Sequence, residues 1–246
     1  MTRAPSPERL RGEGALPEAG CAVVLVRVAE GQFHLGLGRG REPRERVLHL
    51  AWHRILRDEE LARMVRGADR RLCPAAVITL ALDPLVEEAL RVLVGRVTRR
   101  PANSLAYGFG EVSATFDRAT GEPSEEDAAF TCATFVLAML RSVGVLLVDG
   151  SRWREPSEED RRWQERIGEQ LLAWIETHLH GELLESDLAR AKQRVERDLG
   201  ARRYRPTDVA GAALLPVAAR PAGAAEVDPR AAELVLLLPW PYVAAP

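Results

Sequence analysis

The sequence has few cysteines, a single lysine and no long apolar run, and each of these shortages excludes a class of protein. Its three cysteines, Cys21, Cys73 and Cys132, lie far apart and form no CxxC pair, so we expect neither a disulfide framework nor a cysteine-ligated zinc. No apolar run approaches the roughly 18 residues of a membrane-spanning helix. Residues 1–20 lack the apolar core of a secretory signal. We therefore expect a cytoplasmic protein without a membrane span.

Charge is nearly balanced. The net charge is −2 across 246 residues, and apart from Lys192 the basic charge is carried by arginine. This balance gives no reason to expect binding to nucleic acid. A content of 46% hydrophobic and 28% charged residues is typical of a globular protein with a sizeable core. The length suits one domain with an extension, or two small domains.

What the sequence does contain is a series of strand patterns followed by helix patterns, which predicts an α+β fold. β-branched and alternating apolar residues predict an antiparallel meander with strands at 21–28, 33–38 and 47–53. Helical spacing predicts helices at 55–67, 83–97, 130–143, 182–199 and 205–215, with another long helix after Ser157. Residues 75–82 fit either a strand or a buried helical turn. We expect a flexible leader at 1–18, a core at 19–150 and a helical C-terminal extension at 151–246 that ends in an Ala/Pro-rich tail.

Two histidines lie on corresponding faces of neighbouring predicted strands. Side chains alternate between the two faces of a strand, so His34 shares its face with two glycines, and His49 shares its face with Ala51 and His53. A hairpin between these strands would bring His34 and His49 within cross-strand reach. The small residues beside them would leave room for another group. Periodicity alone leaves the alternative of two unrelated histidines on a solvated face.

Cys132 stands near the start of the apolar run FTCATFVLAML at 130–140. A helix N-terminus lowers the pKa of a thiol, and a neighbouring imidazole can take its proton, so this position suits a nucleophile. If Thr131 caps the helix, Cys132 lies in the first turn. If the acidic run that begins at Ser124 forms a capping box, Cys132 lies two turns further in, where the dipole has little effect. Alternatively, Cys132 is a buried core residue, as free cysteines often are.

These pieces resemble a known group of enzymes. The segment HLGLG…RVLHLA is similar to the strand pair HVGIY…MIHA of the NlpC-type papain-like cysteine hydrolases, and FTCATFV resembles their nucleophile helix, DCSGLV. The usual members have the cysteine first. Here the histidines come first, which resembles the circularly permuted branch that includes the lecithin:retinol acyltransferase-like and PPPDE-like groups. The resemblance covers residues 20–148, and Thr131 and Ala133 replace the usual Asp and Ser beside the cysteine.

The resemblance implies a papain-like permuted core in which the antiparallel meander packs on the nucleophile helix. It also implies roles for individual residues. Cys132 would be the nucleophile, His34 the general base and His49 the residue that orients the base. The aromatic segment that carries Tyr107 and Phe109, upstream of the cysteine, would line the substrate pocket. We expect Trp52 and His53, at the end of the second histidine strand, to contact the substrate as well, and His53 is a second candidate for the orienting role.

The implied activity is that of a thiol hydrolase that cleaves an amide bond in a peptide, protein or acyl-amide substrate through a cysteine acyl-enzyme. The backbone N–H of Cys132 would be one oxyanion donor. An acyltransferase or thioesterase of the same fold is an alternative. A non-catalytic interaction protein that binds a protein partner through the C-terminal helices is another. No metal or organic cofactor is implied.

Overall fold

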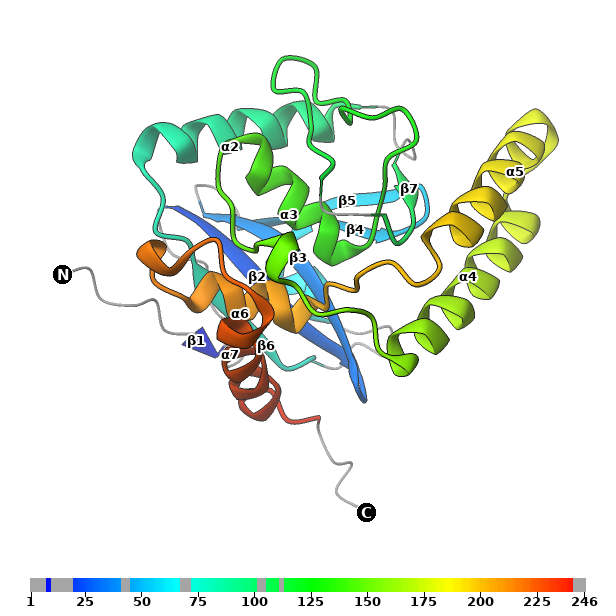
Figure 1. Ribbon diagram of the computed structural model, residues 1–246. Coiled ribbons are helices and arrows are strands. Elements are labelled where there is room, and N and C mark those ends of the chain that lie inside the picture. Colours follow the sequence, from blue (N-terminus) through cyan, green and yellow to red (C-terminus); the bar gives the residue numbers. More distant parts are fainter. Residues whose placement is uncertain are drawn as a thin grey trace.

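An antiparallel sheet, built from the first third of the chain, lies at the centre of the fold (Figure 1). The computed structural model describes residues 8–9, 20–40, 45–66, 72–100, 105–110 and 113–240. The strands follow one another in the sheet in the order β1-β6-β2-β3-β4-β5. Their bounds are β1 Glu8–Arg9, β2 Gly20–Ala29, β3 Gln32–Gly40, β4 Arg46–Trp52, β5 Ile55–Glu60 and β6 Ala75–Thr79. The predicted mixed α+β class and the meander of three neighbouring strands are therefore confirmed.

Some predicted features fall partly outside the described residues. These are the leader at 1–7 and 10–18, the loop between the histidine strands at 41–44, residues 101–104 of the aromatic segment and the last six residues, 241–246.

Both faces of the sheet are buried at its centre, which explains why β2 is almost continuously apolar. Alternate residues of β2, β3 and β4 belong to the main core, which contains Val23, Leu25, Leu35, Leu37, Leu48 and Leu50. Ala22, Val24 and Val26 of β2 and Val47 of β4, with Leu61 and Met64, belong to a second and smaller apolar cluster. The alternation of β2 thus divides its apolar side chains between two separate clusters.

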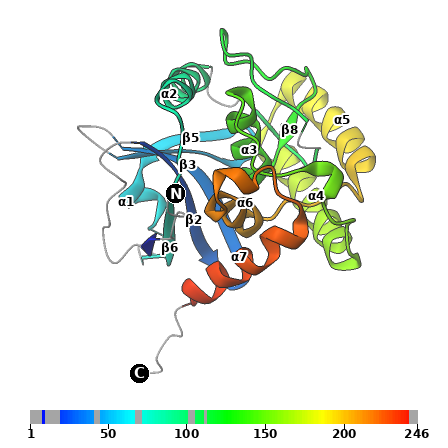
Figure 2. The same cartoon turned by 60° about the vertical axis from the view of Figure 1, so that its left-hand side comes forward.

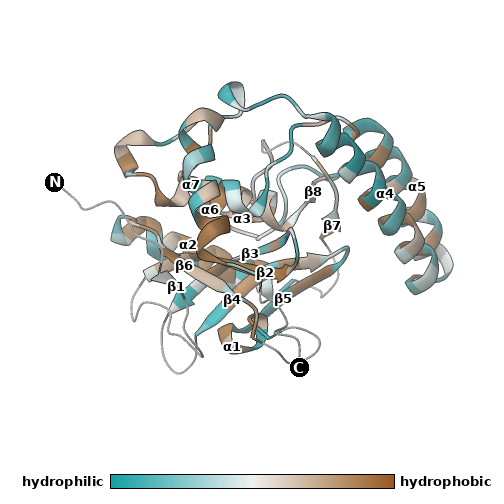
Figure 3. Ribbon diagram, turned by 90° about the horizontal axis from the view of Figure 1, so that it is seen from below, coloured by the Kyte–Doolittle hydropathy of each residue, from teal (hydrophilic) through white to brown (hydrophobic). Residues whose placement is uncertain are grey.

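Helices cover the two faces unequally. α2 (Pro84–Thr98), α3 (Cys132–Ser142) and α6 (Pro206–Leu214) lie over the main core, whereas the short α1 (Leu61–Met64) lies on the opposite face (Figures 2 and 3). α6 comes from beyond the core boundary that we predict at residue 150, yet it contacts β2 and β3 directly. α7 (Ala224–Leu237) packs against α6, where Gly211 permits a close approach because a Cβ there would lie 2.9 Å from the backbone nitrogen of Ala231.

α4 (Glu158–His178) and α5 (Gly181–Asp198) form a helical hairpin that extends away from the sheet and is largely hydrophilic (Figures 1 and 3). A capping box starts α4 where the sequence predicts a long helix: the Ser157 hydroxyl accepts the backbone N–H of Asp160, and the Asp160 carboxylate accepts the backbone N–H of Ser157. Trp163 packs at the base of the hairpin, against the ring of Phe109 in the core. The remaining elements are short: β7 Ala106–Tyr107, β8 Ala129–Phe130, and the 3-10 turns Gly150–Arg152 and Val217–Ala219.

The prediction of a helix at 55–67 is wrong. Residues 55–60 form β5, which pairs antiparallel with β4, and only the four residues of α1 are helical. Asp58 of this segment makes ion pairs with neighbouring strands instead. Asp58 Oδ1 lies 3.1 Å from Arg46 Nε, and Asp58 Oδ2 lies 2.6 Å from Arg39 Nη2. These ion pairs satisfy the polar face of an edge strand.

Two other sequence interpretations are decided by the structure. The ambiguous segment 75–82 contains strand β6. The Ala/Pro-rich tail contains α7, whose buried Val227, Ala231 and Leu234 form an apolar stripe. Alanine favours a helix, and the burial of this stripe stabilises α7 even though Pro229 lies within it.

Candidate active site

Cys132 is the first residue of α3. Thr131 caps the helix: its hydroxyl accepts the backbone N–H of Thr134, and its own backbone N–H donates to the Thr134 hydroxyl at 2.8 Å. Ser124 does not start this helix, because its hydroxyl accepts the backbone N–H of Thr115 at 3.1 Å instead. Of the two helix starts that the sequence allowed, the one that places the thiol in the first turn is therefore present.

The thiol of Cys132 is almost enclosed, with 8% of the residue exposed. Burial raises the pKa of Cys132 to about 11, because a thiolate loses the hydration that water would give it. The backbone N–H groups of Leu35, Ala133 and Cys132 itself lower this pKa in part. At neutral pH the thiol is therefore protonated, and donors for a developing negative charge already surround the sulfur.

His34 and His49 are joined as the sequence predicts, and the chain of contacts continues to a third residue. His34 Nε2 lies 2.7 Å from His49 Nδ1, and His49 Nε2 lies 2.8 Å from Glu59 Oε1. The hydrogen bond from His49 lowers the pKa of Glu59, so this residue is a carboxylate at neutral pH. A carboxylate only accepts hydrogen bonds, so His49 Nε2 donates to it. In the tautomer in which His49 Nδ1 is the acceptor, His34 Nε2 donates to it.

This arrangement leaves His34 Nδ1 as a bare acceptor, with no partner among the residues that the structure describes. Burial, together with the neighbouring His49, lowers the pKa of His34 to about 3. His34 is therefore a neutral imidazole at pH 7 with one nitrogen free to take a proton. Glu59 and His49 fix which nitrogen that is.

Glu59 is the functional candidate that the sequence interpretation missed. It lies in the segment that helical spacing assigned to a helix, but in β5 it stands directly across from Val47, on the face of the sheet that carries His49. Arg63 of α1 also contacts it, with Nε 3.3 Å from Glu59 Oε2. Strand alternation in 55–60 was the signal that would have placed it beside His49.

Among the described residues, no hydrogen bond joins the thiol of Cys132 to His34 or His49. α3 packs on the face that carries Leu35 and Leu37, whereas His34 and His49 point toward the smaller cluster on the other face. The reason is the strand alternation itself: the bulky apolar face attracts the helix, and the histidines occupy the opposite face.

The thiol nevertheless lies near the backbone that joins His34 to Leu35. The β3–β4 ladder contains three pairs and ends at Leu37 and Leu48, and beyond it the side chains of His34 and His49 bridge the two strands. The thiol is near the backbone N–H of Leu35, which is bonded to the carbonyl carbon of His34. The sulfur therefore lies beside the backbone of His34, although the imidazole projects to the other face.

The aromatic residues that we expect to line a pocket are mostly packed. The rings of Trp52 and Tyr107 lie 4.5 Å apart. Burial raises the pKa of Tyr107, and the nearby Cys132 raises it further, which places this tyrosine beside the thiol. Phe109 is 4% exposed and packs edge-to-face on Trp163 of α4, so it contributes to the core. Among these residues, only Trp52 and Tyr107 adjoin the site.

His53 has a different environment from His34 and His49. The backbone N–H of Tyr107 donates to His53 Nδ1 at 3.2 Å, and His53 Nε2 lies 3.1 Å from Asp187 Oδ2 of α5. Both ring nitrogens are thus occupied, and the residue is 1% exposed. Burial lowers its pKa, and Asp187 opposes this shift. His53 connects the end of β4 to the helical hairpin and does not orient His34.

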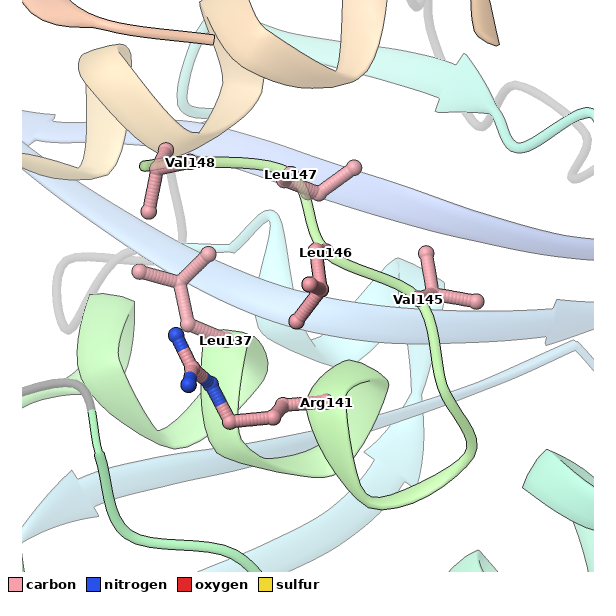
Figure 4. A pocket seen from close by; sticks show the side chains of 6 residues that line it. All are labelled: Leu137, Arg141, Val145, Leu146, Leu147 and Val148. Atoms are coloured by element: carbon pink, nitrogen blue, oxygen red, sulfur yellow. The ribbon is translucent and has the colours of Figure 1, made fainter. Parts of the chain in front are cut away.

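Other parts of the described chain provide no comparable candidate for a functional site. The hollow between α3 and residues 145–148, at the end of α3 remote from Cys132, is too small for a water molecule (Figure 4). Within the described ranges, no three histidine, cysteine, aspartate or glutamate residues are grouped so that they could hold a metal. No helix in the same ranges has the length and apolar character needed to cross a membrane.

Comparisons with protein-family models, with curated proteins and with solved structures give no match for this chain.

Proposed function

We propose that this protein is a thiol hydrolase of the circularly permuted papain-like, NlpC-type group, which cleaves an amide bond through an acyl-enzyme on Cys132. The observation that carries the proposal is the position of the thiol. It lies at the first residue of a capped helix and beside the backbone of His34, whose imidazole is held by His49. Glu59 extends the arrangement to a chain of three side chains.

The resting pair is neutral, because the pKa of Cys132 is raised to about 11 and that of His34 is lowered to about 3. The proton therefore leaves the thiol as the sulfur attacks, which is general-base catalysis, and no preformed thiolate is required. The acceptor of this proton is His34 Nδ1, so the step requires the thiol and the imidazole, which lie on opposite faces of the sheet in the resting structure, to come together. His34 becomes an imidazolium, and its Nε2–H donates to His49, which donates to the Glu59 carboxylate.

The reaction then follows two balanced steps. Sulfur bonds to the carbonyl carbon, the carbon–nitrogen bond breaks, and His34 gives its proton to the departing amine. Water next gives a proton to His34 as its oxygen attacks the thioester carbon, the carbon–sulfur bond breaks, and His34 returns the proton to the sulfur, which releases the carboxylic acid and the free thiol. The backbone N–H of Cys132 at the start of α3 is one donor to the oxyanion, and the positive end of the helix dipole adds to its effect.

Acylation by a simple activated ester tests this proposal without knowledge of the substrate. Mixing the protein with p-nitrophenyl acetate should release a burst of nitrophenolate equal to the amount of protein, with the acetyl group found on Cys132 by peptide mass spectrometry. Cys132→Ala should abolish the burst, whereas Cys73→Ala should leave it unchanged. A burst that persists in Cys132→Ala, or acetylation at other residues alone, would contradict the proposal.

A non-catalytic interaction protein is the second candidate. It is favoured by the raised pKa of Cys132 and by the lack of a hydrogen bond between its sulfur and an imidazole. The projecting α4–α5 hairpin would then be the surface that binds a protein partner. Absence of any burst, together with an unreactive Cys132, would favour this candidate.

A further inference from the structure

A pocket of about 190 Å³ lies between α5 and the segment that leads into β8. Its walls carry both signs of charge: four arginines, and four acidic residues that include Glu125, Glu126 and Asp187. Ala106 of β7 and Ala128, four residues before Cys132, also contribute to the walls. The pocket therefore adjoins the strands β7 and β8 that lead to the candidate site.

Two of the four arginines already have carboxylate partners. Arg54 Nη2 lies 2.8 Å from Asp187 Oδ1, and its Nε binds the other oxygen of the same carboxylate. Arg100 Nη1 lies 2.5 Å from Glu122 Oε2. Both partners of each pair belong to the wall of the pocket. Because the carboxylates neutralise the charge of Arg54 and Arg100, neither arginine attracts an anionic ligand.

Arg194 differs from both. It is 8% exposed, and its Nε is buried with no hydrogen-bond partner within the described part of the chain. The carboxylate oxygen that it pairs with, Asp127 Oδ1, is 4.0 Å away, which is too far for a hydrogen bond. A guanidinium has five N–H donors, and burying one of them, here Nε, without an acceptor is costly. Arg190, one turn earlier on α5, lines the same pocket.

We propose that this pocket binds a small zwitterion of the amino-acid class, with its carboxylate on Arg194. A carboxylate offers a guanidinium two acceptors in matching geometry, which satisfies the unused donors. Glu125 and Glu126 on the facing wall disfavour a doubly charged anion such as phosphate and provide a counter-charge for an ammonium group. The volume suits a small molecule and excludes a polymer. This inference holds whether or not Cys132 is a nucleophile.

Calorimetric titration of the full chain with glycine, L-alanine, acetate and inorganic phosphate tests the proposal. The two amino acids should bind saturably and more tightly than acetate, and phosphate should bind weakest. Arg194→Met should weaken amino-acid binding by at least about tenfold, the usual effect of losing a charged hydrogen-bond pair. Lys192→Met is the matched control, because it removes a positive charge from an exposed position on the same helix outside the pocket, and it should bind as the parent does.

The stability of Arg194→Met and one further variant separate a binding site from a structural arginine. Arg194→Met should fold with an unchanged or higher melting temperature, since it removes a buried charge and keeps an apolar stem. Changing Glu125 and Glu126 together to glutamine should remove the preference for amino acids over acetate. The proposal is overturned if no amino acid binds, if phosphate binds tightest, if Arg194→Met binds as the parent does, or if it melts lower without ligand. Cys132→Ala should bind normally.

Discussion

His34 Nε2 lies 2.7 Å from His49 Nδ1, and the two rings meet edge-to-face at the point where β3 and β4 stop pairing. This contact fixes the ring of His34 from one side. Glu59 holds His49 from the other side, so the free Nδ1 of His34 is the only nitrogen of the three-residue chain without a partner among the described residues. The predictions that follow concern how the arrangement of His34, His49 and Glu59 is held in place, or how it acts on Cys132.

Gly36→Ala should disrupt the histidine contact. A Cβ at this position would lie 2.4 Å from Val47 Cγ1 and 3.3 Å from the Cβ of His49, and Val47 is β-branched and has little rotamer freedom. We expect a loss of about 1–3 kcal/mol in unfolding free energy, as is usual for overpacking, and a changed histidine ring environment. Urea unfolding and histidine NMR signals measure both. Gly95→Ala on α2, where a Cβ meets nothing, should not destabilise the protein.

Glu59→Gln should lower the reactivity of Cys132 without unfolding the protein. The amide keeps the size and one acceptor oxygen, but it removes the charge that stabilises an imidazolium in the chain. We expect a decrease of about tenfold or more in the rate of acylation by p-nitrophenyl acetate and a shift in its pH profile. Glu60→Gln, whose side chain lies on the other face of β5, should react as the parent does. Equal rates for both variants would show that Glu59 is structural.

The lowered pKa of His34 predicts how stability depends on pH. The unfolded chain takes up the proton below a pH of about 6.5, whereas folded His34 takes it up only near its pKa of about 3. More protons are bound by the unfolded state between these values, so unfolding free energy falls as pH falls through this window. The contribution of one group is at most about 1.4 kcal/mol per pH unit, and less here because His34 is partly exposed.

Urea unfolding across this pH window, with His34→Gln as the comparison, isolates that contribution. The parent should lose stability faster than the variant as the pH is lowered. Parallel curves would mean that His34 titrates normally in the folded protein, contrary to its position in the chain of three side chains.

Thr131 should be needed for the start of α3. Thr131→Val keeps the shape but loses the hydroxyl that caps Thr134, and we expect it to cost about 1 kcal/mol. Thr131→Ser retains a capping hydroxyl and should be close to the parent. Because the cap determines that Cys132 is the first helical residue, the valine variant should also lower the acylation rate. Stability and acylation rate are both measurable on the two variants.

The strand alternation carried more information than our sequence interpretation used. It placed His34 and His49 on one face, which the structure confirms. The same alternation placed Leu35, Leu37, Leu48 and Leu50 on the opposite face, and an apolar helix packs on the bulkier face. The sequence pattern therefore already placed Cys132, on the helix that packs against the leucines, on the opposite face of the sheet from the two imidazoles.

Other features had no local signal. The β4–β5 turn is formed at His53 and Arg54, and Arg54 adopts a positive φ of 56° without the glycine or asparagine that usually marks such a turn. The turn was therefore not predicted, and the charged residues that follow it were assigned to a helix. For the same reason the contact between Glu59 and His49 was not predicted. The contacts of His53 and Asp187, 134 residues apart, depend on the docking of the helical hairpin and are not encoded by any short pattern.

The relative labelling of the three cysteines by iodoacetamide tests the central claim most directly. Accessibility alone predicts that Cys73, which is partly exposed, reacts before Cys132 and Cys21, which are 8% and 2% exposed. The proposed chemistry predicts that Cys132 reacts first at neutral pH and that His34→Ala removes this advantage. Labelling of Cys73 first, or a Cys132 rate that is unchanged in His34→Ala, would contradict it.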